Sequence, residues 1–325
     1  MYHPGSALGI RPGYYPNLSP EQHQAVLKLR GLVEQNSLSF EDEENEYLKL
    51  LRFLRARKFD VQKAYTMLAA DVAWRSDKKD LRQSSSAEIL GCDSATMYAY
   101  FPTWMYGFDK QQRPVSWRQF GKFEISKVLK LTTMEKLIRF HGWETEQAVR
   151  KIHEQSKSTT YNIETFVLVV DAAGWHLSLA TSDAFTFIKG MAGTDSDHYP
   201  ERLGTMLLIN APSVLSFAWR VIQAFLDDVT KAKIRIMGTD PKEWQPVLFD
   251  LIDRDNVPEM YGGFAPNPTP ETAFASMDPP LPHPAVLKAG QGEEAEQNPQ
   301  PPEPPHEGGI EIDIGASASS AAAKA

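Results

Sequence analysis

The chain has 325 residues, enough for one large domain or two small ones, and 42% of them are hydrophobic, enough to form a sizeable core. Its formal net charge of −8 lies mostly in residues 265–325, and residues 1–264 are nearly neutral, with 32 basic and 33 acidic residues, so no basic character indicates nucleic-acid binding. A single cysteine, Cys92, excludes an intrachain disulfide and is typical of a reducing compartment.

The N-terminus lacks the apolar segment of a signal peptide, and no run reaches the roughly 20 apolar residues of a membrane-spanning helix. We therefore expect a cytoplasmic protein.

We expect residues 1–18 to be flexible and residues 19–95 to form a helical lobe. Ser19-Pro20-Glu21-Gln22 has the pattern of a capping box with proline at the first helical position, so it predicts a helix start.

Residues 47–60, YLKLLRFLRARKFD, begin as an amphipathic helix whose apolar stripe ends at Leu54. The next positions on that face are Arg57 and Lys58. In one interpretation they complement the negative end of the helix dipole, and Asp60 caps a following helix. In the other, the two cations point at an anion beside the core.

The middle of the chain changes from helical to strand-like patterns. TWMYGFD and RPVSWRQF predict a β-hairpin, and Thr132 with Glu135 predicts the start of a long helix. Three short apolar runs follow, at 165–171, 205–211 and 233–238, separated by helical stretches. This order predicts an α/β fold with a mixed, largely parallel sheet covered by helices on both faces.

Residues 213–226, SVLSFAWRVIQAFL, are apolar on nearly every side of a helix. Such a helix is typical of a core, where every face is covered. Alternatively, it is a lid with one face toward an apolar ligand and the other toward a membrane.

Sequence signatures of enzymes are largely missing. The sequence has no phosphate-binding G-x-x-x-x-G-K-[ST] loop, no G-x-S-x-G nucleophile motif and no H-E-x-x-H metal motif. Asp171, His176 and Asp183 could form an acid/base set, but we find no nucleophile, and Asp171 is better explained as a cap for the turn before Gly174. We expect no enzyme activity, no cofactor and no metal.

The C-terminal region from residue 265 to 325 holds 12 of the 23 prolines and most of the net negative charge. Its composition predicts a disordered tail, in which the alternating segment IEIDI (310–314) could add to a sheet edge. A proline-rich tail could also engage a protein partner.

Several separated motifs resemble the CRAL-TRIO lipid-binding family, specifically its fungal-type phosphatidylinositol transfer proteins. LLRFLRARKFDV is similar to the signature of that family's helical region. YPERLGTMLLINAP followed by FLDDVTKAKI is similar to its strand, gate helix and following segment, and VPEMYGGFAP (257–266) is similar to its closing motif. The resemblance implies a lipid-binding domain at 96–264, with an apolar lipid cavity closed by a gate helix at 213–226.

The resemblance also implies the residues that hold the inositol-phosphate headgroup. Cations would bind the phosphodiester, and carboxylates would accept hydrogen bonds from inositol hydroxyls. The residues that match the family's headgroup motif are Arg57, Lys58, Asp109, Glu201, Arg202, Thr230 and Lys233.

At positions where relatives that bind phosphatidylcholine carry hydroxyl and aromatic groups, this sequence differs. The expected cavity and gate residues are Met105, Ser116, Thr145, Phe166, Leu168, Phe217, Val221, Ile222 and Phe225. Phe166 and Leu168 replace hydroxyls on the cavity strand, and the aromatic cage for choline is missing. We therefore expect phosphatidylinositol as one ligand and an apolar lipid, such as a sterol, rather than phosphatidylcholine as any second ligand.

The function implied is phosphatidylinositol binding and transfer by a monomer that contacts membranes transiently, with Golgi or endosomal membranes as candidates. The alternative is a regulatory module that senses phosphatidylinositol and presents it to a lipid kinase. The sequence features for these two functions are identical, and an exchange assay would separate them.

Overall fold

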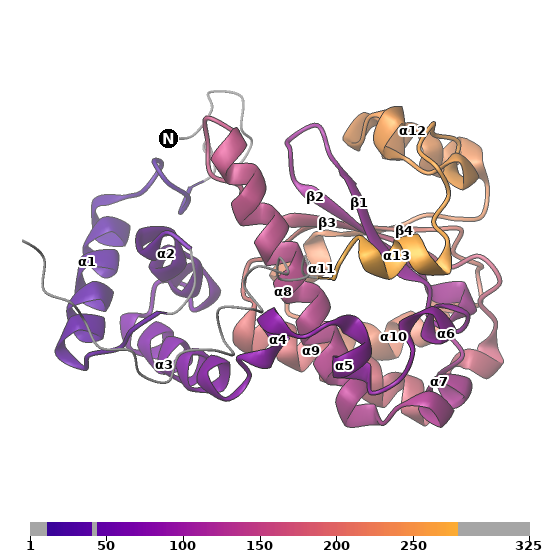
Figure 1. The fold of residues 1–325 in the computed structure, drawn as a ribbon. Helices are drawn as coiled ribbons and strands as arrows, with labels where there is room; N and C mark the ends of the chain where they lie inside the picture. Colours follow the sequence, from indigo (N-terminus) through magenta and orange to yellow (C-terminus); the bar gives the residue numbers. More distant parts are fainter. Residues whose placement is uncertain (1–11, 41–43, 279–325) are drawn as a thin grey trace, which may run out of the picture. The chain divides into compact units, whose positions relative to one another are not determined.

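A computed structural model describes residues 12–40 and 44–278 (Figure 1). Six helices form the N-terminal lobe and the passage to the sheet: α1 (Pro20–Gln35), α2 (Glu46–Ala56), α3 (Val61–Asp77), α4 (Asp80–Gln83), α5 (Ser86–Leu90) and α6 (Ser94–Tyr98). Ser19 and Gln22 form the predicted capping box of α1, and Asp60 caps α3 as predicted. Helices α1, α2 and α3 share a small apolar core that includes Leu29, Phe53 and Leu68.

Five strands form one sheet in the order β1-β2-β3-β4-β5: β1 (Thr103–Phe108), β2 (Pro114–Gln119), β3 (Phe166–Asp171), β4 (Leu203–Ile209) and β5 (Ile234–Ile236). Strands β1 and β2 are antiparallel, whereas β2 to β5 are parallel. The predicted hairpin, the three strands and the largely parallel sheet are therefore confirmed.

Helices cover both faces of the sheet (Figure 1). The remaining ones are α7 (Ile125–Leu131), α8 (Met134–Ser158), α9 (Ser182–His198), α10 (Leu215–Ile222), α11 (Asp228–Ala232), α12 (Pro241–Leu251) and α13 (Pro270–Ala275). On one face, Trp117 of β2 stacks on Tyr261 at a ring distance of 5.4 Å, and Tyr261 contacts Trp244 of α12. On the other face, Val170 and Leu208 pack against Leu215 of α10.

The expected start of the disordered tail at residue 265 is wrong. Residues 270–275 form α13, capped by Thr269, and Phe274 and Met277 are buried in the main core. Asp278 accepts hydrogen bonds from the backbone and hydroxyl of Ser86. The high proline content of this region indicated disorder. Residues 270–278 are nevertheless folded, because a few of their side chains are buried in the core. The IEIDI segment lies outside the described residues.

The N-terminal segment also departs from the expectation of a flexible stretch at residues 1–18. Within the part that the structure describes, Gly13 accepts from Arg55, and the Tyr14 hydroxyl donates to Glu201. The segment that leads into α1 therefore makes specific contacts with distant elements.

Candidate functional site

Polar residues gather where the parallel strands begin. Arg113 directly precedes β2, Glu164 lies just before β3, Arg202 directly precedes β4, and Lys233 directly precedes β5. Because the amino ends of parallel strands lie at one edge of a sheet, residues far apart in the sequence meet there. The helical lobe reaches the same edge through α2.

Arg52 of α2 joins this edge to the lobe. It is 2% exposed, pairs with Glu44 at 2.8 Å and donates to the backbone oxygen of Pro200. Arg202 is 4% exposed and also pairs with Glu44 at 2.8 Å, while it donates to the backbone oxygen of Glu164. Two buried guanidinium groups therefore share the carboxylate of Glu44.

The pKa values reflect this arrangement. Burial alone would raise the pKa of Glu44, but the charges of Arg202 and Arg52 hold it well below the usual carboxyl range. Burial and the like charge of Arg52 lower the pKa of Arg202 to about 10. Burial and Arg52 thus make the positive charge of Arg202 less favourable, and an additional anion nearby would stabilise that charge.

A second ion pair extends the cluster toward the N-terminal segment. Arg55 pairs with Glu164 at 2.7 Å, and both side chains are buried. The Arg55 guanidinium also lies 3.9 Å from the centre of the Tyr14 ring.

Two of the predicted headgroup residues form the next pair. Lys233 Nζ lies 3.1 Å from Glu201 Oε2, and the backbone N–H of Lys233 donates to the Thr230 oxygen. The Thr230 hydroxyl donates to Asp227, the N-cap of α11, at 2.6 Å. Glu201 and Lys233 therefore contact each other, and Thr230 is joined to Lys233 through the backbone.

Arg57 and Lys58 do not continue the apolar stripe of α2. The helix ends at Ala56, Arg57 is its C-cap, and Lys58 is exposed with φ +52°. No described carboxylate forms an ion pair with either side chain, and no contact joins them directly to the Glu201–Lys233 pair. The buried cationic side chains of α2 are instead Lys49, Arg52 and Arg55, which the sequence comparison missed.

Two candidate residues have left-handed backbone conformations that are uncommon outside glycine. Glu201 has φ +60° and Lys58 has φ +52°. Such a conformation costs roughly 1–2 kcal/mol per residue and is often found at functional sites.

Asp109 lies in a separate pair at the same edge of the sheet. It accepts from the backbone N–H of Arg113 at 2.8 Å and from its guanidinium at 2.6 Å. A Cβ atom at Gly204 would lie 2.6 Å from Arg113 Nη1, so the glycine of the YPERLG motif makes room for this guanidinium. Asp109 thus anchors Arg113, and among the described residues its side chain forms no hydrogen bond or ion pair with the other six candidates.

A mostly apolar row of residues, the floor, crosses the sheet one to four residues beyond the charged edge. Met105, Ser116 and Leu168 are in register across β1, β2 and β3, and the row continues through Met206 and Ile234. Residues paired in this way share one face of the sheet. Leu168 and Met206 pack against the apolar cluster that includes Leu215 and Ala218, so α10 covers this face of the sheet.

The other expected cavity residues are distributed around this floor. Thr145 is buried in α8 and its hydroxyl donates to the His141 oxygen within the same helix. Phe166 packs against the main core at a register shift between β3 and β4. Ile222 lines a cavity under α10, and Phe225 lies in the 3₁₀ turn η3 (Gln223–Phe225) that continues this helix.

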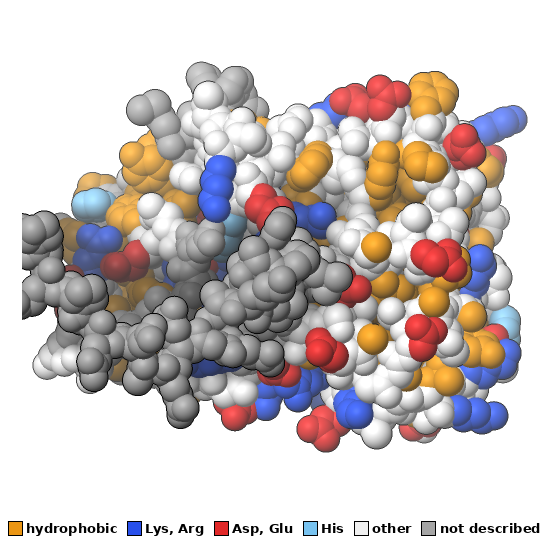
Figure 2. All heavy atoms as spheres, viewed as in Figure 1, with side chains coloured by type: hydrophobic (Ala, Val, Ile, Leu, Met, Phe, Trp, Pro, Cys, Tyr) orange, Lys and Arg blue, Asp and Glu red, His pale blue; other side chains and the backbone are white. Residues whose placement is uncertain are grey.

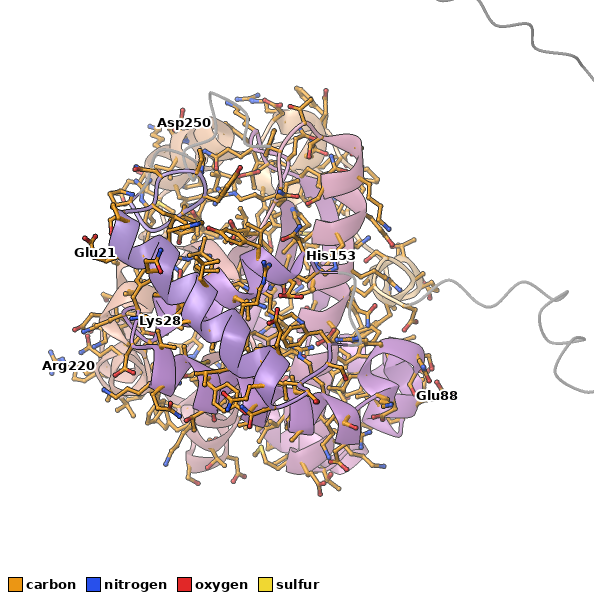
Figure 3. The ribbon with its side chains drawn as sticks, turned by 90° about the vertical axis from the view of Figure 1, so that its left-hand side faces the viewer. Glu21, Lys28, Glu88, His153, Arg220 and Asp250 are labelled. Atoms are coloured by element: carbon orange, nitrogen blue, oxygen red, sulfur yellow. The ribbon has the colours of Figure 1, made fainter. Side chains whose placement is uncertain are left out.

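Helix α10 is not covered on every side, so the core-helix interpretation is wrong. Leu215 and Ala218 are buried, whereas Phe217 is 59% and Val221 42% exposed. Arg220 extends outward from this helix (Figure 3), and its guanidinium lies 5.4 Å from the Phe217 ring centre.

The space under α10 is small in this conformation. Phe120, Phe185, Leu215 and Ile222 help to line a cavity of about 20 Å³. Sites that hold drug-sized ligands have volumes of roughly 300–1,000 Å³. The cavity under α10 is therefore much smaller in this conformation than the lipid-sized cavity that we expected there.

The structure offers little support for the acid/base alternative. Asp171 accepts from the Ala173 backbone, from Asn210 and from the Tyr261 hydroxyl. His176 instead forms a hydrogen bond with Ser178.

Within the described residues, no group of three His, Cys, Asp or Glu side chains is placed to hold a metal ion. None of the described helices combines the length and the apolar character that a membrane span requires.

Charges on the visible surface are mixed. Lys and Arg side chains alternate with Asp and Glu over the face drawn in Figure 2. This pattern differs from the single-sign basic surface of many nucleic-acid-binding proteins.

Comparisons with known proteins agree with these features. The CRAL/TRIO domain model matches residues 98–263, and the CRAL/TRIO N-terminal domain model matches residues 25–70. The SEC14 cytosolic factor of Kluyveromyces lactis is 32% identical over 262 residues, which cover 80% of this chain and 83% of the relative. The phosphatidylinositol/phosphatidylcholine transfer protein SFH4 of Arabidopsis thaliana is 33% identical over 220 residues, which cover 67% of this chain and 35% of the relative.

A solved structure has the same fold. The crystal structure of Sfh5 aligns with a TM-score of 0.60 and 16% identity, over 84% of this chain and 97% of that one. The family models and the relatives together confirm the resemblance found in the sequence, and the chain belongs to the CRAL/TRIO family, among the relatives of the SEC14 cytosolic factors.

Proposed function

We propose that this protein binds phosphatidylinositol and transfers it between membranes without covalent chemistry. The observation that carries the proposal is the buried charge cluster beside an apolar floor. Four cations, Arg52, Arg55, Arg202 and Lys233, meet three carboxylates, Glu44, Glu164 and Glu201. Among these seven described side chains, positive charges outnumber negative charges by one before Arg57 and Lys58 are counted.

The position of the cluster suits an amphipathic ligand. Ile234, at the end of the apolar row, directly follows Lys233, and Leu168 lies four residues beyond Glu164. At about 3.3 Å per strand residue, the charged edge and the apolar floor are neighbours. A phosphodiester would bind the cations, inositol hydroxyls would donate to carboxylates, and acyl chains would lie on the floor under α10.

The names of the relatives support this proposal. Those named above are a cytosolic factor and a phosphatidylinositol/phosphatidylcholine transfer protein. We extend lipid transfer to this chain, with residence in the cytosol and transient contact with endomembranes. The alternative of presenting lipid to a kinase gains no support from these relatives. No enzyme activity, cofactor or metal is part of the proposal.

The headgroup residues in this proposal are the seven candidates together with Arg52, Arg55, Glu44 and Glu164. The first seven come from the motif comparison, and the other four come from the contacts around them. Met105, Ser116 and Leu168 supply the floor. A sterol or similar apolar lipid is the proposed second ligand, because Leu168 and Phe166 offer no hydroxyl to a choline-phosphate.

Vesicle-to-vesicle transfer of phosphatidylinositol by the variant Arg57→Ala with Thr230→Asp tests the proposal. Aspartate at position 230 is at the third position of α11, where a carboxylate favours the helix, so folding should be retained. We expect transfer to be abolished, because a phosphate loses a cation and meets a like charge. Transfer at the wild-type rate by the folded variant would refute the site.

Thr96→Asp provides a matched control. Thr96 has the same position in α6, and its hydroxyl donates to the N-cap Asp93 at 2.7 Å, as Thr230 donates to Asp227. We expect this control to transfer phosphatidylinositol at the wild-type rate.

A further inference from the structure

Tyr14 connects the N-terminal segment to the charged edge of the sheet. Its hydroxyl donates to Glu201 Oε2 at 3.2 Å, and its ring lies against the Arg55 guanidinium, with 3.9 Å to the ring centre. Arg55 also donates to the backbone oxygen of Gly13. Residues 13 and 14 thus contact both α2 and the turn before β4.

The hydroxyl of Tyr14 stays a proton donor at neutral pH. Burial, together with the charges of Glu201 and Glu164, raises its pKa to about 12 against the opposing effect of Arg55. Its hydrogen bond to a carboxylate is therefore retained throughout the physiological range.

The carboxylate of Glu201 is constrained on one side. Tyr14 and Lys233 Nζ both approach Oε2, at 3.2 and 3.1 Å. Among the described residues no donor reaches Oε1. The left-handed backbone of Glu201 further restricts the orientation of its side chain. Two donors on one oxygen thus leave the other oxygen available to an external hydroxyl.

We propose that Tyr14 is a positioning residue that sets headgroup specificity, because it holds Glu201 with Oε1 free to accept a hydroxyl of a polyhydroxylated headgroup. This inference rests on the proposed lipid-binding function and deepens it. The phosphodiester is bound elsewhere in the cluster, by the cations. Tyr14 therefore affects recognition of the sugar-like ring and leaves recognition of the phosphate unchanged.

The variant Tyr14→Phe tests the proposal, because it keeps the ring against Arg55 and removes only the hydroxyl. Binding is measured with phosphatidylcholine vesicles that contain either phosphatidylinositol or phosphatidylglycerol. Both lipids carry one phosphodiester, but phosphatidylglycerol has fewer hydroxyls. We expect affinity for phosphatidylinositol to fall roughly three- to tenfold, the usual effect of one hydrogen bond, and affinity for phosphatidylglycerol to change less than about twofold.

Tyr106→Phe is a matched control. Tyr106 lies on β1 and is 39% exposed, and its hydroxyl forms no hydrogen bond with another described residue. We expect it to leave both affinities unchanged. An equal loss for both lipids in Tyr14→Phe, or no loss for either, would overturn the proposal, since neither result shows an effect specific to ring hydroxyls.

A double-mutant cycle with Glu201→Gln tests whether Tyr14 acts through Glu201. In the Glu201→Gln background, Tyr14→Phe should cause no further loss of phosphatidylinositol binding. A further three- to tenfold loss would show that Tyr14 acts independently and would overturn the proposal. If the wild-type protein binds neither lipid, the proposed function fails as well; if it binds phosphatidylinositol and Tyr14→Phe keeps the selectivity, this inference alone fails.

Discussion

Lys233 Nζ lies 3.1 Å from Glu201 Oε2, and this ion pair joins the residue before β5 to the turn before β4. The two side chains are 15% and 12% exposed, so the pair is largely shielded from water. Of the seven candidate headgroup residues, these two contact each other through their side chains.

Exchanging the two charges separates the structural role of this pair from its role in binding. The variant Glu201→Lys with Lys233→Glu keeps an ion pair, so its free energy of unfolding should exceed that of Lys233→Ala. It should lose phosphatidylinositol transfer, because the cation and the acceptor have changed places relative to the ligand. Urea unfolding and vesicle transfer provide the measurements. Normal transfer by the exchanged variant would show that the pair is structural only.

The left-handed backbone at Lys58 leads to a second prediction. Lys58→Gly should raise the free energy of unfolding by up to about 1 kcal/mol, because glycine adopts φ +52° without steric cost. It should also lower phosphatidylinositol binding by about tenfold, because a cation is lost.

Ser37→Gly is the control for this variant, since Ser37 has φ +51° and lies in the turn after α1. It should bring a similar gain in stability without any change in binding. A loss of stability in Lys58→Gly would mean that its side chain contributes more than the strained backbone costs.

The end of the folded unit is tested by truncation. A chain that ends at Phe264 loses α13 and the buried Phe274 and Met277, so it should be strongly destabilised. Removal of one buried phenylalanine side chain alone costs about 3–5 kcal/mol. A chain that ends at Pro279 should keep the wild-type melting temperature. Equal melting temperatures for the two truncations would contradict the packing of α13.

The exposed face of α10 is expected to contact membranes. Phe217→Asp with Val221→Asp should leave the melting temperature nearly unchanged, because both side chains are exposed. Co-sedimentation with vesicles should fall at least tenfold, since burying one such side chain contributes about 1.5–3 kcal/mol. Leu27→Asp on α1, where Leu27 is 44% exposed, is the control and should bind vesicles normally. Equal binding by the α10 variant would exclude this face as the contact.

The low pKa of Glu44 predicts a dependence of stability on pH. Its pKa is lower in the folded protein than in the unfolded chain, so its contribution is present above the unfolded value of about 4.3 and is lost as the pH falls below it. Glu44→Gln should cost about 3–5 kcal/mol at pH 7, because Arg52 and Arg202 lose their shared partner. The difference from wild type should shrink at pH 3. A constant difference across this range would contradict the charge-based explanation.

Local patterns in the sequence predicted most of the elements. The hairpin, the three apolar strands and the cap at Asp60 depend on residues close in the sequence, and all are present. The extent of the fold at its C-terminal end was not predicted, because Phe274 is stabilised by distant partners that a proline-rich composition does not reveal. The same limitation applies to the small cavity under α10, which depends on how a helix packs.

The charged edge was only partly predictable. Glu201, Thr230 and Lys233 were identified through motifs and lie together. The sequence did not indicate Arg55 and Tyr14 as site residues, because each of them contacts partners that lie more than 40 residues away in the sequence. One sequence pattern could have indicated the charged edge. Glu164 and Arg202 are charged residues that lie just before apolar strands, and the starts of parallel strands meet at one edge of the sheet.

The identity of the lipid carried by the purified protein tests the central claim most directly. Extraction of bound lipid and mass spectrometry, followed by transfer assays with each lipid found, should reveal phosphatidylinositol and its efficient transfer. Phosphatidylcholine should be transferred poorly, because Leu168 and Phe166 provide no hydroxyl for its phosphate. A protein that carries and transfers phosphatidylcholine efficiently and ignores phosphatidylinositol would contradict the account.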